Sequence, residues 1–260
     1  MNRLEKIRII RKALSAGMPS IGSWMQIPNS SVAEIMGQAG YDWVAVDLEH
    51  GAISVHQLPD FFRALELGGT LPLARLVQGQ AKDCKQALDA GAGGVIVPMV
   101  ESAAQLERVR DACRWPPAGT RGVGFSRANL FGKHFDAYAE EAQAPLLVAM
   151  IEHIRAVENL GEILQVRGLD AILTGPYDLS ASMGLTAQFE HPDFRSAMSR
   201  IRHLAERHHV PSGMHVVAPD PDELRTRLNE GYRFIAYSID AVFINKAAQS
   251  PLKTKLPEFP

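Results

Sequence analysis

Cysteine is scarce in this sequence, and neither acidic nor basic residues are in clear excess. The two cysteines, Cys84 and Cys113, lack the spacing of metal ligands and are too few for a disulfide framework, which predicts buried thiols in a reducing cytoplasm. With 27 basic and 29 acidic residues the formal net charge is −2. Neither a nucleic acid nor an acidic membrane surface is therefore an expected partner.

Long apolar runs are also missing. None approaches the ~18 residues of a membrane-spanning helix, and the first residues of the chain contain no apolar signal core. At the same time 46% of the residues are hydrophobic, which is enough for a large core and excludes disorder. These absences exclude disulfide-stapled, collagen-like, coiled-coil and membrane-spanning proteins, and the expected location is the cytoplasm.

Three missing motifs limit the chemistry. No G-x-G-x-x-G follows the first predicted strand, which argues against a dinucleotide-binding doubly wound sheet. No Gly-rich phosphate cradle follows the last two predicted strands, where most phosphosugar and flavin barrels would need one. None of the eight lysines lies within or at the end of a predicted strand. This disfavours a Schiff-base mechanism and favours a metal ion as the electron sink.

The sequence does contain a regular alternation of short apolar runs with amphipathic segments, the pattern of a parallel sheet. Eight such units in 260 residues predict a single (β/α)8 TIM barrel domain. Its core is expected at about 18–248, with an N-terminal helix and an extended C-terminal tail over 249–260. A doubly wound open sheet is the alternative. The predicted strands are residues 20–26, 43–48, 71–76, 94–99, 146–151, 171–174, 213–217 and 234–239.

Signals at segment ends predict the helices between these strands. Ser31 and Glu34 form a predicted capping box for a helix over 29–39, which Gly40 is placed to end. Two connections are long. Residues 100–145 are expected to hold one helix before a stretch rich in Gly and Pro, and residues 175–212 a short turn and a long helix. Loops of this length in a compact barrel are usually functional or interface elements.

Polar side chains gather at the C-terminal ends of the predicted strands, where barrels of this type carry their chemistry. The residues at these ends are Trp24, Asp47, Glu49, His50, Arg75, Pro98, Met99, Glu152, Gly175, Pro176, Tyr177, Asp178, His215 and Ser238. Ionisable side chains seldom end buried strands by accident. We therefore expect a binding or catalytic site at one mouth of the barrel.

Two carboxylates in this set end consecutive predicted strands. Because neighbouring parallel strands lie ~4.8 Å apart, Glu152 and Asp178 could together hold one hard divalent cation, with water and substrate oxygens at its remaining positions. The alternative is that each carboxylate caps a helix or pairs with an arginine.

A buried arginine and a histidine complete the candidate chemistry. Arg75 needs an anion, which could be a structural carboxylate such as Asp47 or a substrate carboxylate or enolate. His50 follows Asp47 by three residues, and pairing with that carboxylate would fix the imidazole tautomer and suit a general base. The alternative is a loop histidine bonded to the backbone. Asp89, before Gly91, is a helix-end or linking carboxylate.

Taken together, the motifs resemble the HpcH/HpaI family of class II, metal-dependent pyruvate aldolases. The resembling stretches keep the family's order over about residues 10–248. They are residues 42–51 with DLEHG at 47–51, Arg75, LDAGA at 88–92, VPMV at 97–100, PPAGTRGVG at 116–124, Ile151-Glu152, GPYDLSASMG at 175–184 and His191-Pro192. Each motif alone is weak, and the set is highly specific.

The resemblance implies a (β/α)8 barrel assembled as a homohexamer, a trimer of dimers with exchanged C-terminal helices. It implies that Glu152 and Asp178 bind Mg²⁺, Mn²⁺ or Co²⁺. It also implies that His50, paired with Asp47 and near Asp89, moves protons, and that Arg75 holds the pyruvate oxygen and enolate. The substrate carboxylate would meet the backbone at Tyr177 and Asp178, and the substrate pocket would include Trp24, Met150, Gly175 and Pro176.

Two positions depart from the family pattern near the expected pocket. Met150 stands where many members have Gln, two residues before the metal-binding Glu, and Tyr177 stands where many have Ala in a Gly-Pro-Ala-Asp turn. A polar group is lost and a phenol is added. The departures leave the metal ligands in place and affect the expected choice of substrate.

The predicted function is that of a cytoplasmic carbon–carbon lyase. It would cleave a 4-hydroxy-2-oxo acid to pyruvate and an aldehyde, or run the reverse addition, through a metal-stabilised pyruvate enolate. One alternative is another reaction through the same enolate, such as citrate-type condensation or oxaloacetate decarboxylation. A second is a non-catalytic barrel that binds carboxylates. The expected partners are small 2-oxo acids and aldehydes.

Overall fold

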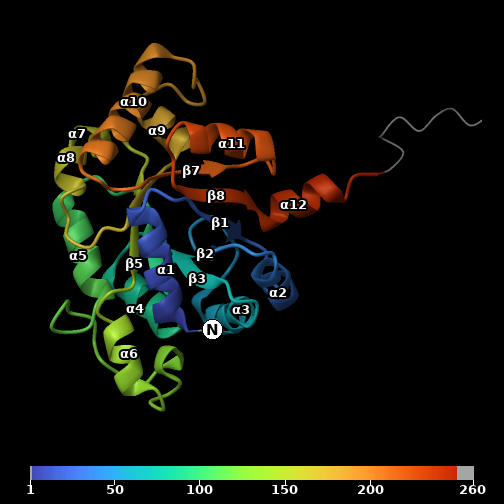
Figure 1. Cartoon of the computed structure of the whole chain (residues 1–260), viewed down its shortest axis with the longest axis vertical. Coiled ribbons are helices and arrows are strands. Elements are labelled where there is room, and N and C mark those ends of the chain that lie inside the picture. The colour runs from blue at the N-terminus through green and yellow to red at the C-terminus, as the bar shows by residue number, and fades with distance from the viewer. Residues whose placement is uncertain (1, 251–260) are drawn as a thin grey trace, which may run out of the picture.

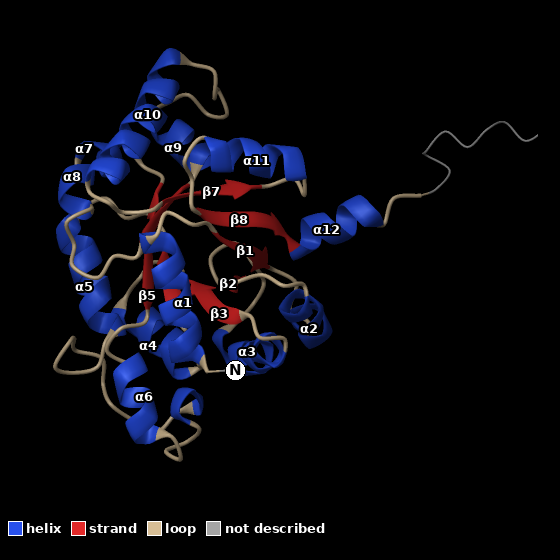
Figure 2. Ribbon diagram, viewed as in Figure 1, coloured by secondary structure: helices blue, strands red, loops and turns tan. Residues whose placement is uncertain are grey.

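The computed structural model describes residues 2–250, and in this part of the chain eight parallel strands form a closed barrel (Figure 1 and Figure 2). The strands pair in chain order, and β8 closes on β1. Their bounds are β1 Ser20–Met25, β2 Trp43–Asp47, β3 Leu71–Arg75, β4 Gly94–Val97, β5 Leu146–Ile151, β6 Ala171–Thr174, β7 Ser212–Val216 and β8 Phe234–Ile239. The predicted TIM barrel is confirmed, and the predicted extended tail lies almost wholly outside the described residues.

Helices precede, connect and follow the strands on the outside of the barrel (Figure 2). Their bounds are α1 Arg3–Ser15, α2 Ser30–Gln38, α3 Leu58–Leu67, α4 Ala81–Asp89, α5 Ala103–Cys113, α6 Phe135–Glu141, α7 Ile154–Glu158, α8 Leu160–Ile163, α9 Pro176–Ser182, α10 Pro192–Arg207, α11 Pro221–Asn229 and α12 Asp240–Ala247. Short 3-10 turns lie at Val55–Gln57 and Arg127–Asn129. The predicted N-terminal helix is α1. No helix in residues 2–250 has the length and apolar character needed to cross a membrane.

The observed strands lie within two residues of the predicted ones at every end. The largest difference is at β4, which ends at Val97 instead of residue 99. Pro98 has no N–H to continue the ladder, and Met99 has a positive φ of 49°, which turns the chain away from the strand direction. This turn directs the main-chain N–H of Met99 toward the Glu152 carboxylate at the end of β5.

Three local predictions need correction. The N-cap of α2 is Asn29, whose Oδ1 accepts from Ser31 N at 2.8 Å, so Ser31 and Glu34 do not form the predicted capping box. The 100–145 connection contains α6 as well as the one predicted helix, and residues 176–182 form α9 where a short turn was expected. Asn29 was placed inside the helix that it caps, whereas the starts of α6 and α9 were assigned to connecting segments.

Replacing Asn29 with alanine should lower the free energy of unfolding by about 1 kcal/mol, because the main-chain donor at Ser31 loses its capping oxygen. The matched control is Ser31→Ala, which removes a hydroxyl that caps nothing in α2 and should change stability by less than about 0.5 kcal/mol. Urea unfolding followed by circular dichroism measures both. A larger loss in Ser31→Ala would show that the capping box operates after all.

The interior of the barrel is filled by large side chains, so it is a packed core and not a channel. The rings of Trp43 and Phe234 stack with centroids 4.4 Å apart, and Trp24 meets Trp43 edge to face. At the end where the strands begin, α1 adds its buried Ile7 and Ile10 to this same cluster. Helix α1 therefore closes one mouth of the barrel, and the C-terminal mouth is the one available for a site.

The first and last strands are joined by more than their ladder. The Asp240 carboxylate accepts from the main-chain N–H groups of Gln26 and Ile27, at 2.9 Å each, and so ties the start of α12 to the end of β1. Beyond this point α12 projects away from the barrel (Figure 1). These hydrogen bonds thus fix the end of β1, which places Trp24 and Gln26 at the C-terminal mouth of the barrel.

Candidate active site

A cavity of about 200 Å³ opens at the C-terminal ends of the strands. It is lined by Trp24, Gln26, His50, Arg75, Met150, Glu152, Leu173, Thr174, Gly175, Pro176, Tyr177, Asp178, His215, Val217 and Ile239. All but two of the predicted site residues are in this lining. The exceptions are Asp47, which lies beneath Arg75, and Asp89, which lies elsewhere.

Glu152 is a buried carboxylate that forms no ion pair within the described part of the chain. One of its oxygens accepts from Met99 N at 2.7 Å, the donor that the left-handed turn after β4 provides. Burial raises the pKa of Glu152 to about 7. The Met99 N–H and the charge of Arg75 oppose the shift, and the carboxylates of Glu49 and Asp178 add to it. Three carboxylates therefore share one region, and Arg75 offsets their effect on the pKa of Glu152 only in part.

Gly175 allows this arrangement because it has no side chain. A Cβ at this position would lie 2.5 Å from Glu152 Oε2, which is closer than any real Cβ contact. Pro176 then begins α9, and Asp178 lies in the first turn of that helix with its side chain exposed to the cavity. In this Gly-Pro-x-Asp sequence, the Glu152 carboxylate packs against the main chain of Gly175. The helix that begins directly after Gly175 carries the Asp178 carboxylate.

The donor set fits a hard divalent cation with few protein ligands. Among residues 2–250 no group of three or more His, Cys, Asp or Glu side chains is arranged to hold a metal. Glu152 and Asp178 remain the proposed ligands, and a cation between them would offset both the burial that raises the pKa of Glu152 and the smaller repulsion from Asp178. Water and substrate oxygens would then complete its coordination.

Arg75 is held rigidly at the end of β3. Its Nε donates to Asp47 Oδ1 at 2.8 Å, and its Nη2 donates to the other Asp47 oxygen. The guanidinium also lies over the Trp24 ring, 4.6 Å from the centroid. Burial raises the pKa of Asp47, but the hydrogen bonds and charge of Arg75 outweigh it and hold that pKa below its usual value. Of the two kinds of anion predicted for Arg75, the structural carboxylate Asp47 is therefore the one that its hydrogen bonds reach in this chain.

The predicted pairing of Asp47 with the His50 ring is wrong. Asp47 receives the main-chain N–H groups of Glu49 and His50, the Gln26 amide and the Arg75 fork, which leaves no place for an imidazole. The His50 side chain is 58% exposed, and its Nε2 lies 3.8 Å from Glu49 Oε2. His50 still lines the cavity, and the carboxylate nearest to its ring is Glu49.

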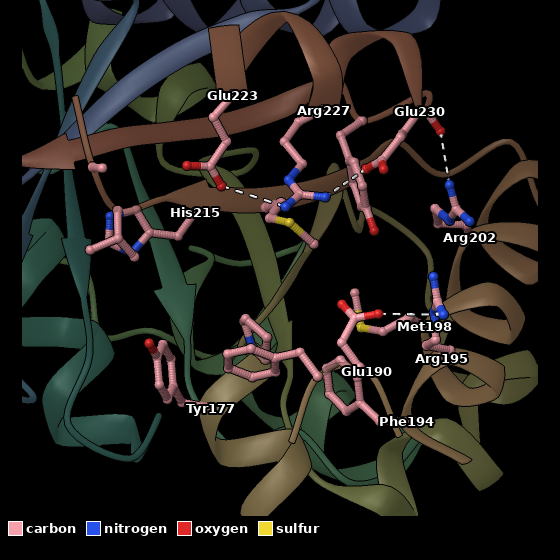
Figure 3. Close-up of a pocket in the computed structure, with 16 residues that line it drawn as sticks. Tyr177, Glu190, Phe194, Arg195, Met198, Arg202, His215, Glu223, Arg227 and Glu230 are labelled. Carbon is pink, nitrogen blue, oxygen red and sulfur yellow. Dashed lines mark hydrogen bonds and ion pairs between the residues drawn. The ribbon is translucent and has the colours of Figure 1, made fainter. Parts of the chain in front are cut away.

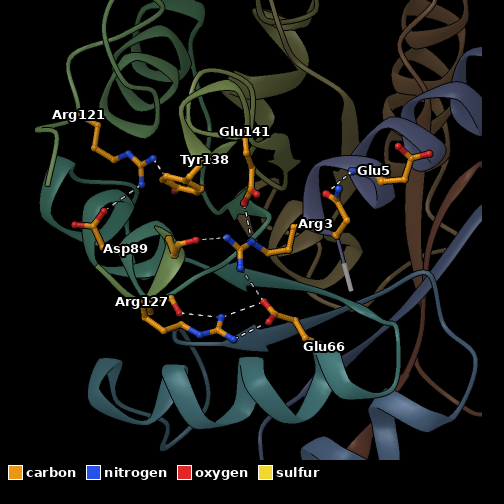
Figure 4. A network of polar contacts seen from close by, with 11 residues as sticks. Arg3, Glu5, Glu66, Asp89, Arg121, Arg127, Tyr138 and Glu141 are labelled. Carbon is orange, nitrogen blue, oxygen red and sulfur yellow. Dashed lines mark hydrogen bonds and ion pairs between the residues drawn. The ribbon is translucent and has the colours of Figure 1, made fainter. Parts of the chain in front are cut away.

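Asp89 does not join the site within this chain. It ends α4, next to the point where β4 begins, and so lies near the opposite mouth of the barrel. There it pairs with Arg121 at 3.3 Å, and Arg121 in turn donates to the Tyr138 hydroxyl (Figure 4). In the same network Arg3 and Arg127 share Glu66, and Arg3 binds Glu141. In this chain Asp89 thus belongs to the contacts that join α1, α4 and α6.

The two departures from the family pattern lie where they were expected. Met150 is buried in the barrel interior and forms part of the cavity wall. Tyr177 is 58% exposed, and its ring meets Phe189 edge to face with centroids 5.0 Å apart. Both residues therefore border the same cavity as the candidate metal ligands.

Two polar residues of the site were present among the strand ends but had no predicted role. Burial raises the pKa of Glu49, which Arg75 and His50 only partly offset, and its Oε2 has no hydrogen-bond partner among the described residues. His215 ends β7 and lines the cavity. The position of Glu49 next to His50, in the same segment as Asp47, was the signal that could have identified it.

Comparison with known proteins gives consistent results. The sequence profile of the family described as HpcH/HpaI aldolase/citrate lyase matches residues 20–247. The chain is 36% identical over 248 residues to the hydroxypyruvate/pyruvate aldolase of Roseobacter denitrificans, covering 94% of this chain and 95% of that protein.

Solved structures agree over nearly the whole length. An HpcH/HpaI aldolase/citrate lyase family protein from Burkholderia cenocepacia superposes with a TM-score of 0.87 at 30% identity, covering 94% of this chain and 98% of that one. Citrate synthase SbnG superposes with a TM-score of 0.80 at 27% identity, covering 94% and 96%. The chain belongs to the HpcH/HpaI aldolase/citrate lyase family, whose members named aldolases are carbon–carbon lyases.

Proposed function

We propose that this chain is a divalent-metal-dependent aldolase that cleaves 4-hydroxy-2-oxo acids to pyruvate and an aldehyde, or forms them. The observation that carries the proposal is the buried Glu152 carboxylate, which lines one small cavity together with Asp178 and Arg75 and whose pKa burial raises to about 7. The name of the Roseobacter relative, a hydroxypyruvate/pyruvate aldolase, supports the same reaction class.

Glu152 and Asp178 would hold the cation, with Mg²⁺, Mn²⁺ and Co²⁺ as candidates. When bound, it would withdraw electron density from the carbonyl of the 2-oxo acid. Asp47 fixes the plane of the Arg75 guanidinium, so Arg75 faces the place where negative charge develops on the enolate oxygen of pyruvate. Such a preorganised donor stabilises the transition state more than the ground state.

His50 would carry the proton. As the C3–C4 bond of the substrate breaks, its electron pair passes into the enolate and the 4-hydroxyl gives its proton to the imidazole, which leaves an aldehyde. Glu49, 3.8 Å from Nε2, replaces Asp47 as the carboxylate that stabilises the resulting charge. The substrate carboxylate would meet the main chain at Tyr177 and Asp178.

The proposal is tested by measuring pyruvate release from a panel of 4-hydroxy-2-oxo acids, before and after treatment with EDTA. We expect turnover with at least one member, loss of turnover after EDTA and recovery when Mg²⁺, Mn²⁺ or Co²⁺ is restored. Pyruvate release that is insensitive to EDTA would contradict the metal assignment. Binding of pyruvate without turnover of any substrate would favour a non-catalytic barrel.

Citrate-type condensation is the second candidate. The observation that favours it is the similarity to citrate synthase SbnG at a TM-score of 0.80 and 27% identity. The same assay separates the two functions when oxaloacetate is added to the panel. Aldol cleavage predicts release of pyruvate from 4-hydroxy-2-oxo acids. Citrate-type condensation predicts little activity on them and consumption of oxaloacetate that depends on an added acetyl donor.

A cytoplasmic homohexamer is the form we propose for the active protein. The segment between α5 and α6, residues 114–134, supports an interface because it exposes apolar side chains at Val123, Phe125, Leu130 and Phe131. The projection of α12 away from the barrel supports exchange of C-terminal helices between copies (Figure 1). Light scattering on the purified protein tests this, since a mass well below six chains would exclude the hexamer.

Tyr177→Ala and Met150→Gln should change the ranking of aldehyde acceptors more than the reaction with pyruvate alone. Both side chains border the cavity, and neither is a candidate metal ligand. Removing the phenol opens the cavity toward Phe189, and an amide at 150 adds a polar group to an apolar wall. The measurement is kcat/KM for short and long acceptors. An unchanged ranking in both variants would mean that these positions do not shape the acceptor site.

A further inference from the structure

A row of polar side chains crosses the C-terminal ends of the first three strands. The β1–β2 ladder pairs Met25 with Val46. The residues that follow these two are Gln26 and Asp47, which brings their side chains opposite each other, and Gln26 Nε2 donates to Asp47 Oδ2 at 2.7 Å. The β2–β3 ladder in turn pairs Asp47 with Arg75, and the arginine fork donates to the carboxylate. A line of hydrogen bonds therefore runs from the end of β1 to the arginine.

The two oxygens of the Asp47 carboxylate are held in different ways. Oδ1 accepts from Arg75 Nε at 2.8 Å and from the main-chain N–H groups of Glu49 and His50, at 3.0 and 3.2 Å. Within residues 2–250, Oδ2 accepts from Arg75 Nη2 and Gln26 Nε2 alone. Gln26 is therefore the one donor to Oδ2 that does not belong to the arginine itself.

This difference matters for the orientation of the guanidinium. Asp47 is fully buried, so an Oδ2 lone pair that loses its donor is costly, and the carboxylate turns toward the partners that remain. The Arg75 fork binds both oxygens and must turn with the carboxylate. With Gln26 in place, the carboxylate is fixed at both oxygens before the arginine binds it.

Gln26 is itself held in place by the last helix. The buried Asp240 carboxylate accepts from the main-chain N–H groups of Gln26 and Ile27, at 2.9 Å each. A carboxylate such as Asp47 can only accept, so the amide nitrogen of Gln26, and not its oxygen, faces Asp47. The donor thus extends from a fixed main chain in a defined orientation.

The opposite side of the candidate site gives Arg75 no comparable support. A cavity of about 640 Å³ adjoins the site beside β7, and charged side chains in its walls pair with each other, as Arg227 does with Glu230 at 3.0 Å (Figure 3). In the part of the chain that the structure describes, the ion-pair partners of Arg75 are Asp47 and Glu49. The orientation of the arginine is therefore set from the β1 and β2 side.

We propose that Gln26 is a positioning residue of the candidate active site, whose amide fixes Asp47 and, through it, the Arg75 guanidinium in the orientation that stabilises the enolate. This inference rests on the proposed aldolase function. Gln26 borders the cavity, but its effect passes through the arginine and needs no contact with the substrate. Small displacements of a preorganised donor are costly to the rate, which gives a distant amide its influence.

The first test is Gln26→Met, which keeps the length of the side chain and removes the donor. In aldol cleavage we expect kcat to fall about tenfold and KM to change less than about twofold, because the arginine acts on charge that develops in the transition state. Gln165→Met is the matched control. It makes the same change at an exposed amide that donates to Gly161 O, and it should alter neither value. Gln26→Leu also removes the donor and should show the same loss if the methionine variant does not fold.

The decisive measurement repeats Gln26→Met in Arg75→Lys protein. Lysine has no fork to align, so the second substitution should lower kcat by less than about twofold, whereas independent sites would each contribute their full effect. An undiminished tenfold loss in the lysine protein, a wild-type kcat in Gln26→Met, or a rise in KM alone would overturn the positioning role and leave the aldolase assignment standing. Wild-type protein that releases no pyruvate from any 4-hydroxy-2-oxo acid would refute the aldolase itself and this inference with it.

Discussion

Glu152→Gln should reduce turnover below detection and weaken metal binding, while the fold stays intact. Glutamine keeps an oxygen that can accept the Met99 N–H, so the turn after β4 loses no partner. It removes the negative charge, however, from one of the two anionic side chains that we propose as ligands of the cation. Asp178→Asn should act in the same direction. Pyruvate release and calorimetric titration with Mn²⁺ measure the two effects.

The stability of these variants distinguishes a metal ligand from a structural carboxylate. Because burial raises the pKa of Glu152, its charge is costly to the metal-free fold, and a neutral glutamine should not lower the melting temperature. Glu158→Gln, on the exposed face of α7, is the matched control and should keep full activity. Full activity in metal-stripped Glu152→Gln protein would refute the metal assignment.

Arg75→Lys should lower kcat by about 10²–10³, the usual effect of losing one donor to a developing oxyanion. Lysine keeps the charge but loses the planar fork that binds both Asp47 oxygens and lies over Trp24. The ammonium group can still pair with one Asp47 oxygen, so we expect the melting temperature to fall by only a few degrees, about what 1–2 kcal/mol produces.

Two measurements separate a catalytic role of Arg75 from a structural one. Steady-state kinetics gives kcat, and calorimetry gives the melting temperature of the same preparation. Arg63→Lys changes an exposed arginine that pairs with Asp60 on α3, and it should leave both values unchanged. A large drop in melting temperature with near-normal kcat would show that Arg75 serves the fold alone.

Most of the fold could be predicted from the sequence because buried parallel strands carry a strong local signal. Short apolar runs bounded by turn residues place a strand without knowledge of its neighbours, and β5, β6 and β8 have their predicted bounds. The differences arise where one residue decides the outcome. Asn29 caps α2 in place of Ser31, and Pro98 with Met99 ends β4 early.

The site was predicted less completely because its side chains pair with residues on neighbouring strands. Asp47 was a candidate partner of both Arg75 and the His50 ring. The β2–β3 register places Asp47 directly opposite Arg75, and the arginine binds it. Sequence spacing carries no information on lateral register. Asp89 shows the same limit. It lies at the end of a helix, where the chain has come back to the mouth at which the strands begin, and it pairs there with Arg121.

The contact of Asp240 with Gln26 and Ile27 has a consequence for protein synthesis. These hydrogen bonds, like the β1–β8 ladder, join residues more than two hundred positions apart, and Asp240 and Gln26 are separated by 214. A chain leaving the ribosome exposes β1 as an unpaired edge until its last strand has emerged. Trp24 and Gln26, which β1 delivers to the cavity, are secured only at that moment. Prematurely terminated chains that lack β8 therefore contain every candidate catalytic side chain and still cannot assemble the site.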